Sequence, residues 1–212
     1  MHAEATFRKP AGNTLVATLW PQSETRGVVR AVVLAFVGAL ILTVAAKIRV
    51  PFYPVPMTLQ TLAVLMLGAA YGPRLAVASV ALYLAQGALG LPIFTNTPPL
   101  AAGPSYFLGS TGGFLAGFLV SAWVVGHAAE RGWDRAPLRL FAVMFFTTAV
   151  TMALGVAWLA TFAQVGTATG LGLGKALAVG LYPFALGELV KVALAAASVS
   201  ATWMVLAKLR GR

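Results

Sequence analysis

The chain has 212 residues, of which 59% are hydrophobic and 9% are charged, and its formal net charge is +10. A soluble domain could not cover so much apolar surface with so few charges, so we expect an all-α protein that crosses a membrane several times. The basic residues flank apolar runs, which favours membrane orientation over nucleic acid binding as the reason for the charge. The absence of cysteine excludes disulfides and thiol catalysis, and two histidines are too few for a histidine metal cluster.

Six apolar stretches are predicted to cross the membrane, because about 20 apolar residues span a bilayer as a helix. They run near Val28–Ala46, Met57–Ala70, Leu75–Leu91, Phe107–Gly126, Leu138–Val165 and Leu177–Leu206. The patch from Leu15 to Trp20 is too short for a span. We therefore expect one membrane domain over residues 28–207, between an N-terminal tail (1–27) and a C-terminal tail (208–212).

The basic residues predict the orientation of these six helices. Three lie on one side of the membrane: Lys47, Arg49 and Lys175. Eleven lie on the other: Arg8, Lys9, Arg26, Arg30, Arg74, Arg131, Arg135, Arg139, Lys208, Arg210 and Arg212. The positive-inside rule then places both termini in the cytoplasm of a multi-pass protein of the inner (cytoplasmic) membrane.

The first span carries a stripe of small residues, and a proline-rich connection follows it. Ala31, Ala35 and Ala39 recur every four residues, which suits either internal packing or docking of another membrane subunit. The outward-facing loop from Lys47 to Gln60 holds three prolines in six residues, which stiffen it. It is either a rigid connection or a lid over a pocket, and Gln60 could offer its amide to a ligand.

The second and third spans form a tight hairpin at Tyr71–Arg74, and the next outward connection runs from Pro92 to Tyr106. This connection is uncharged and rich in proline and small residues, which favours packing over a cavity. Asn96 and Tyr106 are its best hydrogen-bonding groups, although a turn asparagine and an interfacial tyrosine are common on their own. A glycine stripe in the fourth span favours close helix packing, at Gly109, Gly113 and Gly117.

The last apolar stretch contains Pro183, so it is expected to begin with a kinked or separate segment. It also carries Glu188, the one acid within the predicted spans, and Lys191 one helical turn later. Ionised groups at membrane depth are costly and often mark a ligand, ion or proton site. The alternative is a structural ion pair, since the i,i+3 spacing puts both side chains on one face. Glu188 lies 20 residues before Lys208, so the pair is predicted near the outer face.

Signatures of enzymes are missing from the sequence. It has no phosphate loop, no nucleophile elbow and no metal-binding helix motif, so we expect neither ATP hydrolysis nor metal catalysis in this chain. Ligand capture suits the residues better. A small integral membrane enzyme acting on a lipid is the alternative from another class, and it would need a second acid or a metal site.

Several runs together resemble the BioY family. They are spread over roughly residues 28–206 in the family's order: Pro54–Leu62, Tyr71–Arg74, Gly90–Phe94, Phe107–Phe114 and Gly187–Lys191. BioY proteins are the biotin-binding subunits, or S components, of energy-coupling factor transporters. The resemblance implies a six-helix fold that binds biotin near the outer face without a cofactor.

The resemblance also implies partners and site residues. The partners are a transmembrane coupling protein and a pair of ABC-type ATPases, with the alanine stripe at 31, 35 and 39 facing the coupling protein. A self-sufficient biotin transporter, alone or as an oligomer, is the alternative. The candidate ligand residues are Glu188, Lys191, Asn96, Tyr106, Gln60 and Ser110. Family members usually carry Asp where this chain has Glu188, and the extra methylene moves the carboxylate outward.

Overall fold

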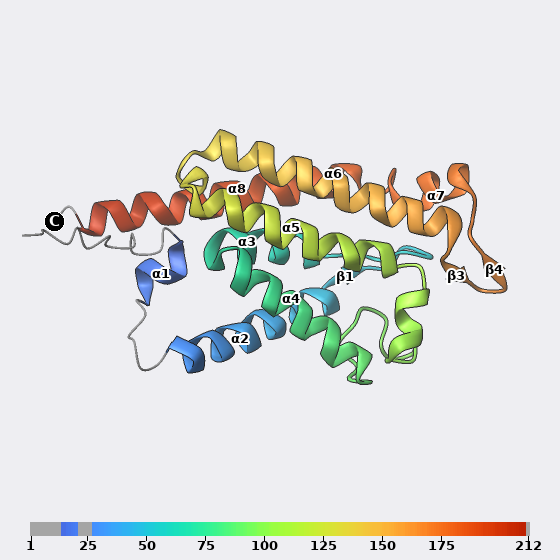
Figure 1. Cartoon of the computed structure of the whole chain (residues 1–212). Coiled ribbons are helices and arrows are strands. Elements are labelled where there is room, and N and C mark those ends of the chain that lie inside the picture. The colour runs from blue at the N-terminus through green and yellow to red at the C-terminus, as the bar shows by residue number, and fades with distance from the viewer. Residues whose placement is uncertain (1–13, 21–26, 211–212) are drawn as a thin grey trace, which may run out of the picture.

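The computed structural model describes residues 14–20 and 27–210. It is a bundle of long helices that run roughly along one axis, with short hairpins gathered at one end (Figure 1). In chain order the elements are α1 (Leu15–Leu19), α2 (Gly27–Lys47), β1 (Arg49–Val50), β2 (Met57–Thr58), α3 (Gln60–Tyr71), α4 (Pro73–Ala88), η1 (Pro104–Leu108), α5 (Gly112–Glu130), η2 (Trp133–Arg135), α6 (Pro137–Thr161), β3 (Gln164–Val165), β4 (Ala168–Thr169), α7 (Leu173–Gly180) and α8 (Ala185–Arg210).

Within the described ranges, four helices are long and apolar enough to cross a bilayer: α2, α5, α6 and α8. Helices α3 and α4 have 12 and 16 residues, fewer than the roughly 20 that span the hydrocarbon core. Six crossings therefore remain a prediction. Most of the predicted N-terminal tail lies outside the described residues, but Leu15 of α1 is buried against the bundle.

Local chemistry explains two predicted breaks, and both are confirmed. Helix α3 ends at Tyr71 and α4 begins at Pro73. Gly72 has φ 80°, which glycine adopts without strain, and proline suits the first turn of a helix because it needs no N–H donor there. Around Pro183, α7 ends at Gly180 and a separate helix α8 begins at Ala185.

Three predicted boundaries are wrong, each beside a short irregular element. Met57 and Thr58 pair with Val50 and Arg49 as an antiparallel hairpin instead of starting the second helix. Phe107 lies in the 3-10 turn η1, so α5 begins only at Gly112. Residues 164–165 leave α6 to form a second hairpin with β4. Apolar composition alone does not separate these turns from the helices that they adjoin.

Helix α5 occupies the centre of the bundle. Its buried residues enter all three core clusters, with Phe118 packed beside α2 and α4, Val125 beside α6 and α8, and Phe114 beside α7. The small-residue stripe explains its close approach to α6: a Cβ at Gly113 or Gly117 would collide with Trp158 or Thr151. Gly109 precedes the helix, so this residue was wrongly assigned to the fourth span.

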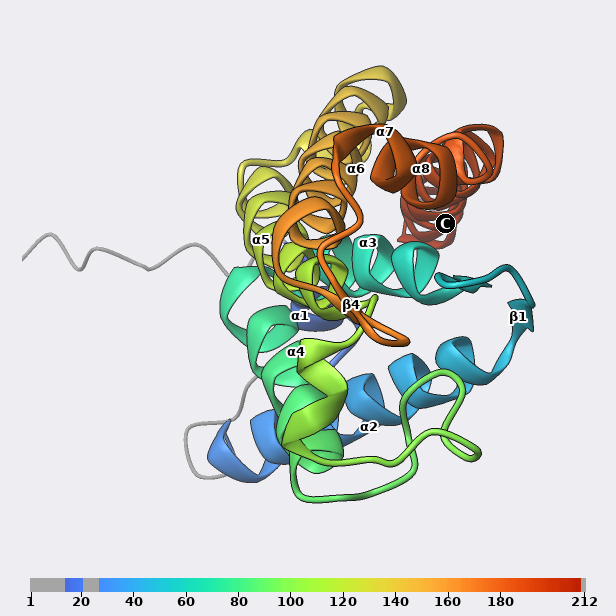
Figure 2. The ribbon, with the colours of Figure 1, turned by 90° about the vertical axis from the view of Figure 1, so that its right-hand side faces the viewer.

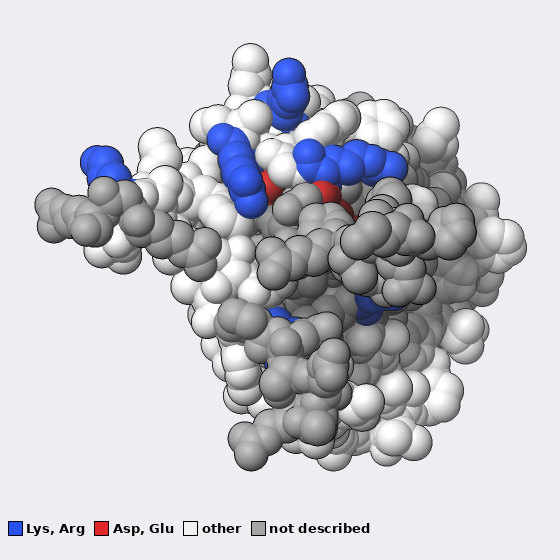
Figure 3. All heavy atoms as spheres, turned by 60° about the vertical axis from the view of Figure 1, so that its left-hand side comes forward, with Lys and Arg blue, Asp and Glu red and all other residues white. Residues whose placement is uncertain are grey.

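The two ends of the bundle differ. Helix α8 finishes at the end that also holds the α3–α4 and α5–α6 turns (Figure 1), and Lys and Arg side chains gather there around a few acidic ones (Figure 3). The opposite end carries both hairpins and α7. Seen from that end, α3 lies between α2 and α8 (Figure 2). All three helices line an apolar groove.

Candidate functional site

A small cavity of about 40 Å³ lies beneath the hairpin end of the bundle. Its walls come from the β1–β2 connection, the 92–106 connection, helices α3 to α6, the segment before α8 and α8 itself. The lining residues are Val55, Pro56, Thr58, Gln60, Thr61, Tyr83, Thr95, Tyr106, Thr111, Phe114, Leu115, Phe118, Met152, Phe184 and Glu188. We call this space the inner cavity. Its wall is mainly apolar, with hydroxyl, amide and carboxylate groups at a few positions.

Glu188 and Lys191 form a buried ion pair beside the inner cavity. Both lie in the first two turns of α8, and Lys191 Nζ is 2.7 Å from Glu188 Oε1. Each residue is only 6% exposed. The other carboxylate oxygen, Glu188 Oε2, is buried without a hydrogen-bond partner among the described residues. Because an unpaired buried acceptor is costly, the carboxylate is prepared for a donor that the chain itself does not supply.

Gln60 lines the inner cavity, and its amide is already engaged. Its Nε2 donates to the Tyr83 hydroxyl at 2.9 Å, while its Oε1 accepts from Thr58 Oγ1 at 3.2 Å. The start of α3 therefore positions Gln60 with bonds to α4 and β2. One N–H of the amide remains for a ligand.

Tyr106 separates the inner cavity from a larger opening above it. Its hydroxyl donates to the Thr95 carbonyl at 2.7 Å, and its ring stacks on Phe94 with centroids 4.5 Å apart. Burial raises the pKa of Tyr106 to about 12, against smaller opposing effects of a hydrogen bond with Thr111 and the charge of Arg49. The phenol therefore stays neutral at physiological pH.

The larger opening, which we call the vestibule, has a volume of about 700 Å³ and shares Pro56, Tyr106 and Thr111 with the inner cavity. Asn96 and Ser110 line the vestibule rather than the inner cavity. Ser110 Oγ donates to the Pro54 carbonyl at 2.7 Å and so ties the proline-rich connection to the start of α5. Two of the six predicted ligand residues thus belong to the entrance.

Besides Tyr106, the 92–106 connection brings Thr95 to the inner cavity. It is 4% exposed, and its Oγ1 has no hydrogen-bond partner within the described chain. The sequence favoured its neighbour Asn96 because an amide offers both a donor and acceptors. This connection is irregular, so the sequence has no periodic pattern that predicts which of the two side chains faces inward.

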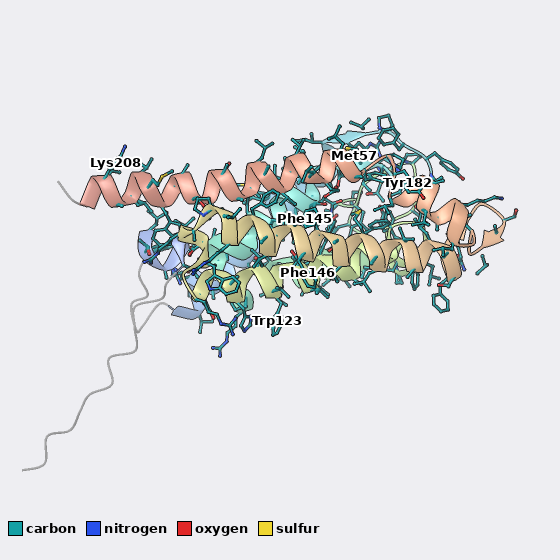
Figure 4. The ribbon with its side chains drawn as sticks, turned by 90° about the horizontal axis from the view of Figure 1, so that it is seen from above. Met57, Trp123, Phe145, Phe146, Tyr182 and Lys208 are labelled. Carbon is teal, nitrogen blue, oxygen red and sulfur yellow. The ribbon has the colours of Figure 1, made fainter. Side chains whose placement is uncertain are left out.

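The proline-rich connection closes over the start of α8. Met57 lies at the hairpin end of the molecule, far from Lys208 at the other end of α8 (Figure 4). A Cβ at Gly187 would come within 2.9 Å of the Met57 sulfur, so glycine at this position lets β2 approach the turn that carries Glu188. Phe52 adds an edge-to-face contact with Phe184 at 5.9 Å.

Comparison with known proteins decides the family. The family model described as "BioY family" matches residues 14–208. The chain belongs to the BioY family. A "Probable biotin transporter BioY" from Pyrococcus horikoshii is 33% identical over 153 residues, which cover 72% of this chain and 83% of the relative. The "Biotin transporter BioY" of Thermotoga maritima is 32% identical over 167 residues, or 79% of this chain and 92% of that protein.

The fold is shared with a solved structure. A crystal structure of the S component for biotin from an ECF-type ABC transporter matches with a TM-score of 0.70 and 21% identity, over 90% of this chain and 95% of that one. Membership of a family of transporters, together with several long apolar helices, makes the chain a multi-pass transport protein of the cell membrane and not an enzyme.

Two further expectations for the BioY chain concern metals and partners. Among the described residues, no group of three or more His, Asp and Glu side chains is placed to hold a metal ion. In the alanine stripe, Ala39 is 1% exposed and packs inside the core. Ala31 and Ala35 are partly exposed, so a partner can reach these two positions without any movement of α2.

Proposed function

We propose that this BioY chain is the membrane subunit that captures biotin from outside the cell and delivers it inward with an ATP-driven energy-coupling module. Its relatives carry the name of biotin transporters, and the solved structure that shares its fold is an S component for biotin. Two buried oxygens on the inner cavity carry the proposal: Glu188 Oε2 and Thr95 Oγ1 both lack a hydrogen-bond partner among the residues that the structure describes.

Biotin supplies the groups that these atoms lack. Its ureido ring has two N–H donors and one carbonyl, so Glu188 Oε2 accepts an N–H and the Thr95 hydroxyl donates to the carbonyl. The thioether ring and alkyl chain suit apolar walls such as Phe114 and Phe184. The carboxylate of biotin then points to the vestibule, where Arg49 lies.

Lys191 acts through Glu188 in this proposal. Its ammonium holds the carboxylate at 2.7 Å and so keeps a charged acceptor in a site from which water is largely excluded. An unpaired carboxylate at this depth would be strongly destabilising. Asn96, Ser110 and Tyr106 guide the ligand through the vestibule, and Gln60 offers its remaining N–H from the cavity wall.

Capture of biotin requires part of the wall to move. The inner cavity of about 40 Å³ is much smaller than the roughly 300–1,000 Å³ of pockets that hold ligands of this kind. The β1–β2 connection and the 92–106 connection are the irregular walls, and they face the vestibule. We propose that they separate to admit biotin and close behind it.

The proposed topology keeps six crossings, with both termini in the cytoplasm. The positive-inside rule supports it, because the α3–α4 and α5–α6 turns and Lys208 lie at the basic end of the bundle. Helices α3 and α4 are short, and the connections after them complete their passage while packed inside the protein. The membrane domain then covers residues 28–207, between cytoplasmic tails at 1–27 and 208–212.

The proposed partners are a transmembrane coupling protein and an ABC-type ATPase pair. Helix α2 supports this proposal, because it exposes apolar side chains beside Ala31 and Ala35, such as Val32 and Phe36 at 50% and 53%. Lipid covers this face until the coupling protein docks.

Titration calorimetry of the purified chain with biotin and a panel of other vitamins tests this function. We expect tight binding of biotin alone, and no heat from biotin would reject the assignment. Reconstitution then separates the two modes of uptake. The chain alone in proteoliposomes should bind biotin without accumulating it, whereas accumulation without any ATPase would indicate a self-sufficient transporter.

A further inference from the structure

Lys47, the last residue of α2, is bound to one short segment of chain that is distant in sequence. Its Nζ donates to the main-chain carbonyls of Pro92, Phe94 and Thr97 at 2.7, 2.8 and 2.6 Å. Thr97 Oγ1 lies 3.4 Å away. An ammonium group has three N–H donors and here finds three carbonyl acceptors, so its hydrogen-bonding capacity is filled by this segment.

The bound segment, residues 92–97, forms the roof of the inner cavity. Thr95 lines the cavity directly. Phe94 is completely buried, stacks on Tyr106 and meets the edge of Tyr83 at 5.3 Å. A Cβ at Gly87 would overlap the Phe94 ring, so the ring fits closely against α4. The place of this segment therefore decides where the Thr95 hydroxyl lies.

Residues 92–97 form neither a helix nor a strand, so no regular pattern of main-chain hydrogen bonds fixes their position. Their main chain turns sharply, with Asn96 at φ 60°, and relies on individual hydrogen bonds. Bonds from an ammonium are about twice as strong as neutral ones. The three bonds to Lys47 therefore tie this roof to the end of α2. They act together with the Tyr106 hydroxyl bond to the Thr95 carbonyl and with the packing of Phe94 against α4.

We propose that Lys47 is a positioning residue for the ligand: its ammonium anchors residues 92–97 to the end of α2 and so holds Thr95 over the inner cavity. This inference rests on the proposed function, in which the inner cavity takes biotin. The hydrogen bonds of the Lys47 ammonium go to the roof, and its effect on the ligand passes through the main chain of residues 92–97. Its three N–H donors are consequently not available to hydrogen-bond the carboxylate of biotin.

Hydrogen exchange of the ligand-free protein tests the anchor without biotin. Lys47→Met removes the three donors and keeps the length of the side chain, so amide exchange across residues 93–103 should rise at least about tenfold. Lys175→Met is the matched control, because Lys175 is an exposed lysine in α7 at the same end of the bundle. Unchanged exchange in Lys47→Met, or an equal rise in Lys175→Met, would overturn the proposal.

Biotin dissociation tests the consequence for the ligand. In Lys47→Met the off-rate should rise about tenfold while the on-rate changes little, because the roof no longer stays closed over bound ligand. The off-rate of a second variant, Lys47→Arg, should lie between those of the wild type and Lys47→Met, since a planar guanidinium keeps the charge but not the three converging bonds. A wild-type off-rate in both variants would contradict the proposal.

Chemical rescue provides the sharpest form of the test. The chain has no cysteine, so in Lys47→Cys the single thiol can be alkylated with 2-bromoethylamine, which rebuilds an ammonium side chain of lysine length. Alkylation with iodoacetamide gives a neutral control. We expect slow exchange and slow dissociation to return only with the ammonium. Rescue by both reagents would show that side-chain bulk suffices and would overturn the role of the charge.

If the wild type binds no biotin, the proposed function fails, and the exchange experiment still decides whether Lys47 anchors the roof.

Discussion

Glu188 and Lys191 place two opposite charges at a buried position beside the inner cavity. Each charge is tolerated at 6% exposure because the other lies 2.7 Å away. The pair nevertheless leaves Glu188 Oε2 without a partner in the described chain. A purely structural pair has no reason to leave this oxygen unpaired on a cavity wall, and this detail favours a ligand role.

Replacing either member of the pair should abolish or severely weaken biotin binding in calorimetry. Glu188→Ala removes the acceptor, and either single variant leaves an unpaired buried charge that costs about 3–5 kcal/mol. The double variant Glu188→Gln/Lys191→Met removes both charges, so it should melt at a higher temperature than Lys191→Met and still not bind biotin. Wild-type affinity in both single variants would exclude Glu188 from the site.

Thr95 and Thr148 offer a matched pair of hydroxyl groups. Both are buried, and both Oγ1 atoms lack a partner among the described residues. Thr148 lines an apolar groove between α6, α7 and α8, outside the inner cavity. Thr95→Val should therefore weaken biotin binding roughly 3- to 10-fold through one lost hydrogen bond, while Thr148→Val should not. Equal effects of the two variants on affinity would refute the assigned role of Thr95.

At the level of elements, the α5–α6 turn is clamped to α8. Trp203 Nε1 donates to Asp134 Oδ2, Ser200 Oγ donates to the Asp134 carbonyl at 3.3 Å, and Arg135 stacks on the Trp203 ring at 4.4 Å. Asp134 is completely buried, and its Oδ1 has no partner in the described part of the chain. The element η2 thus links three helices at the end opposite the inner cavity.

This clamp should respond to pH. Burial raises the pKa of Asp134, against the smaller effects of the Trp203 hydrogen bond and Arg135. A raised folded-state pKa means that the contribution of Asp134 to stability is full below its unfolded value of about 3.9 and is lost as pH rises through the folded value. As pH rises from the unfolded to the folded pKa of Asp134, the melting temperature of Asp134→Asn should fall less than that of the wild type. Melting temperatures of the two proteins that change in parallel with pH would argue against a contribution from Asp134.

For the molecule as a whole, the difference between its two ends supports the proposed direction of transport. The hairpin end holds the vestibule and the inner cavity, and the other end collects basic residues. A capture subunit must open its site to the outside, so the basic end is expected in the cytoplasm. The exposed apolar face of α2 lies alongside the bundle, where a membrane partner could approach it.

Single-cysteine labelling tests this orientation, because the native chain has no thiol. Thr167→Cys lies between β3 and β4, and Arg74→Cys lies in the first turn of α4 at the other end. In intact cells a membrane-impermeant maleimide should label Thr167→Cys alone, and Arg74→Cys should react only after permeabilisation. The reverse pattern would invert the proposed topology, and labelling of the unsubstituted chain would indicate a non-specific reaction.

The sequence alone determined the membrane class, the break at Pro183, the hairpin at Gly72 and the proximity of Glu188 to Lys191. These features depend on composition or on contacts within one helical turn, where spacing fixes geometry. Only the tertiary structure decided that Thr95 rather than Asn96 reaches the inner cavity and that Gln60 bonds to Tyr83. It also decided that Ala39 is internal and that Lys47 bonds to the main chain of residues 92–97. Each of these depends on how irregular segments and distant helices pack together, and no local periodicity encodes that packing.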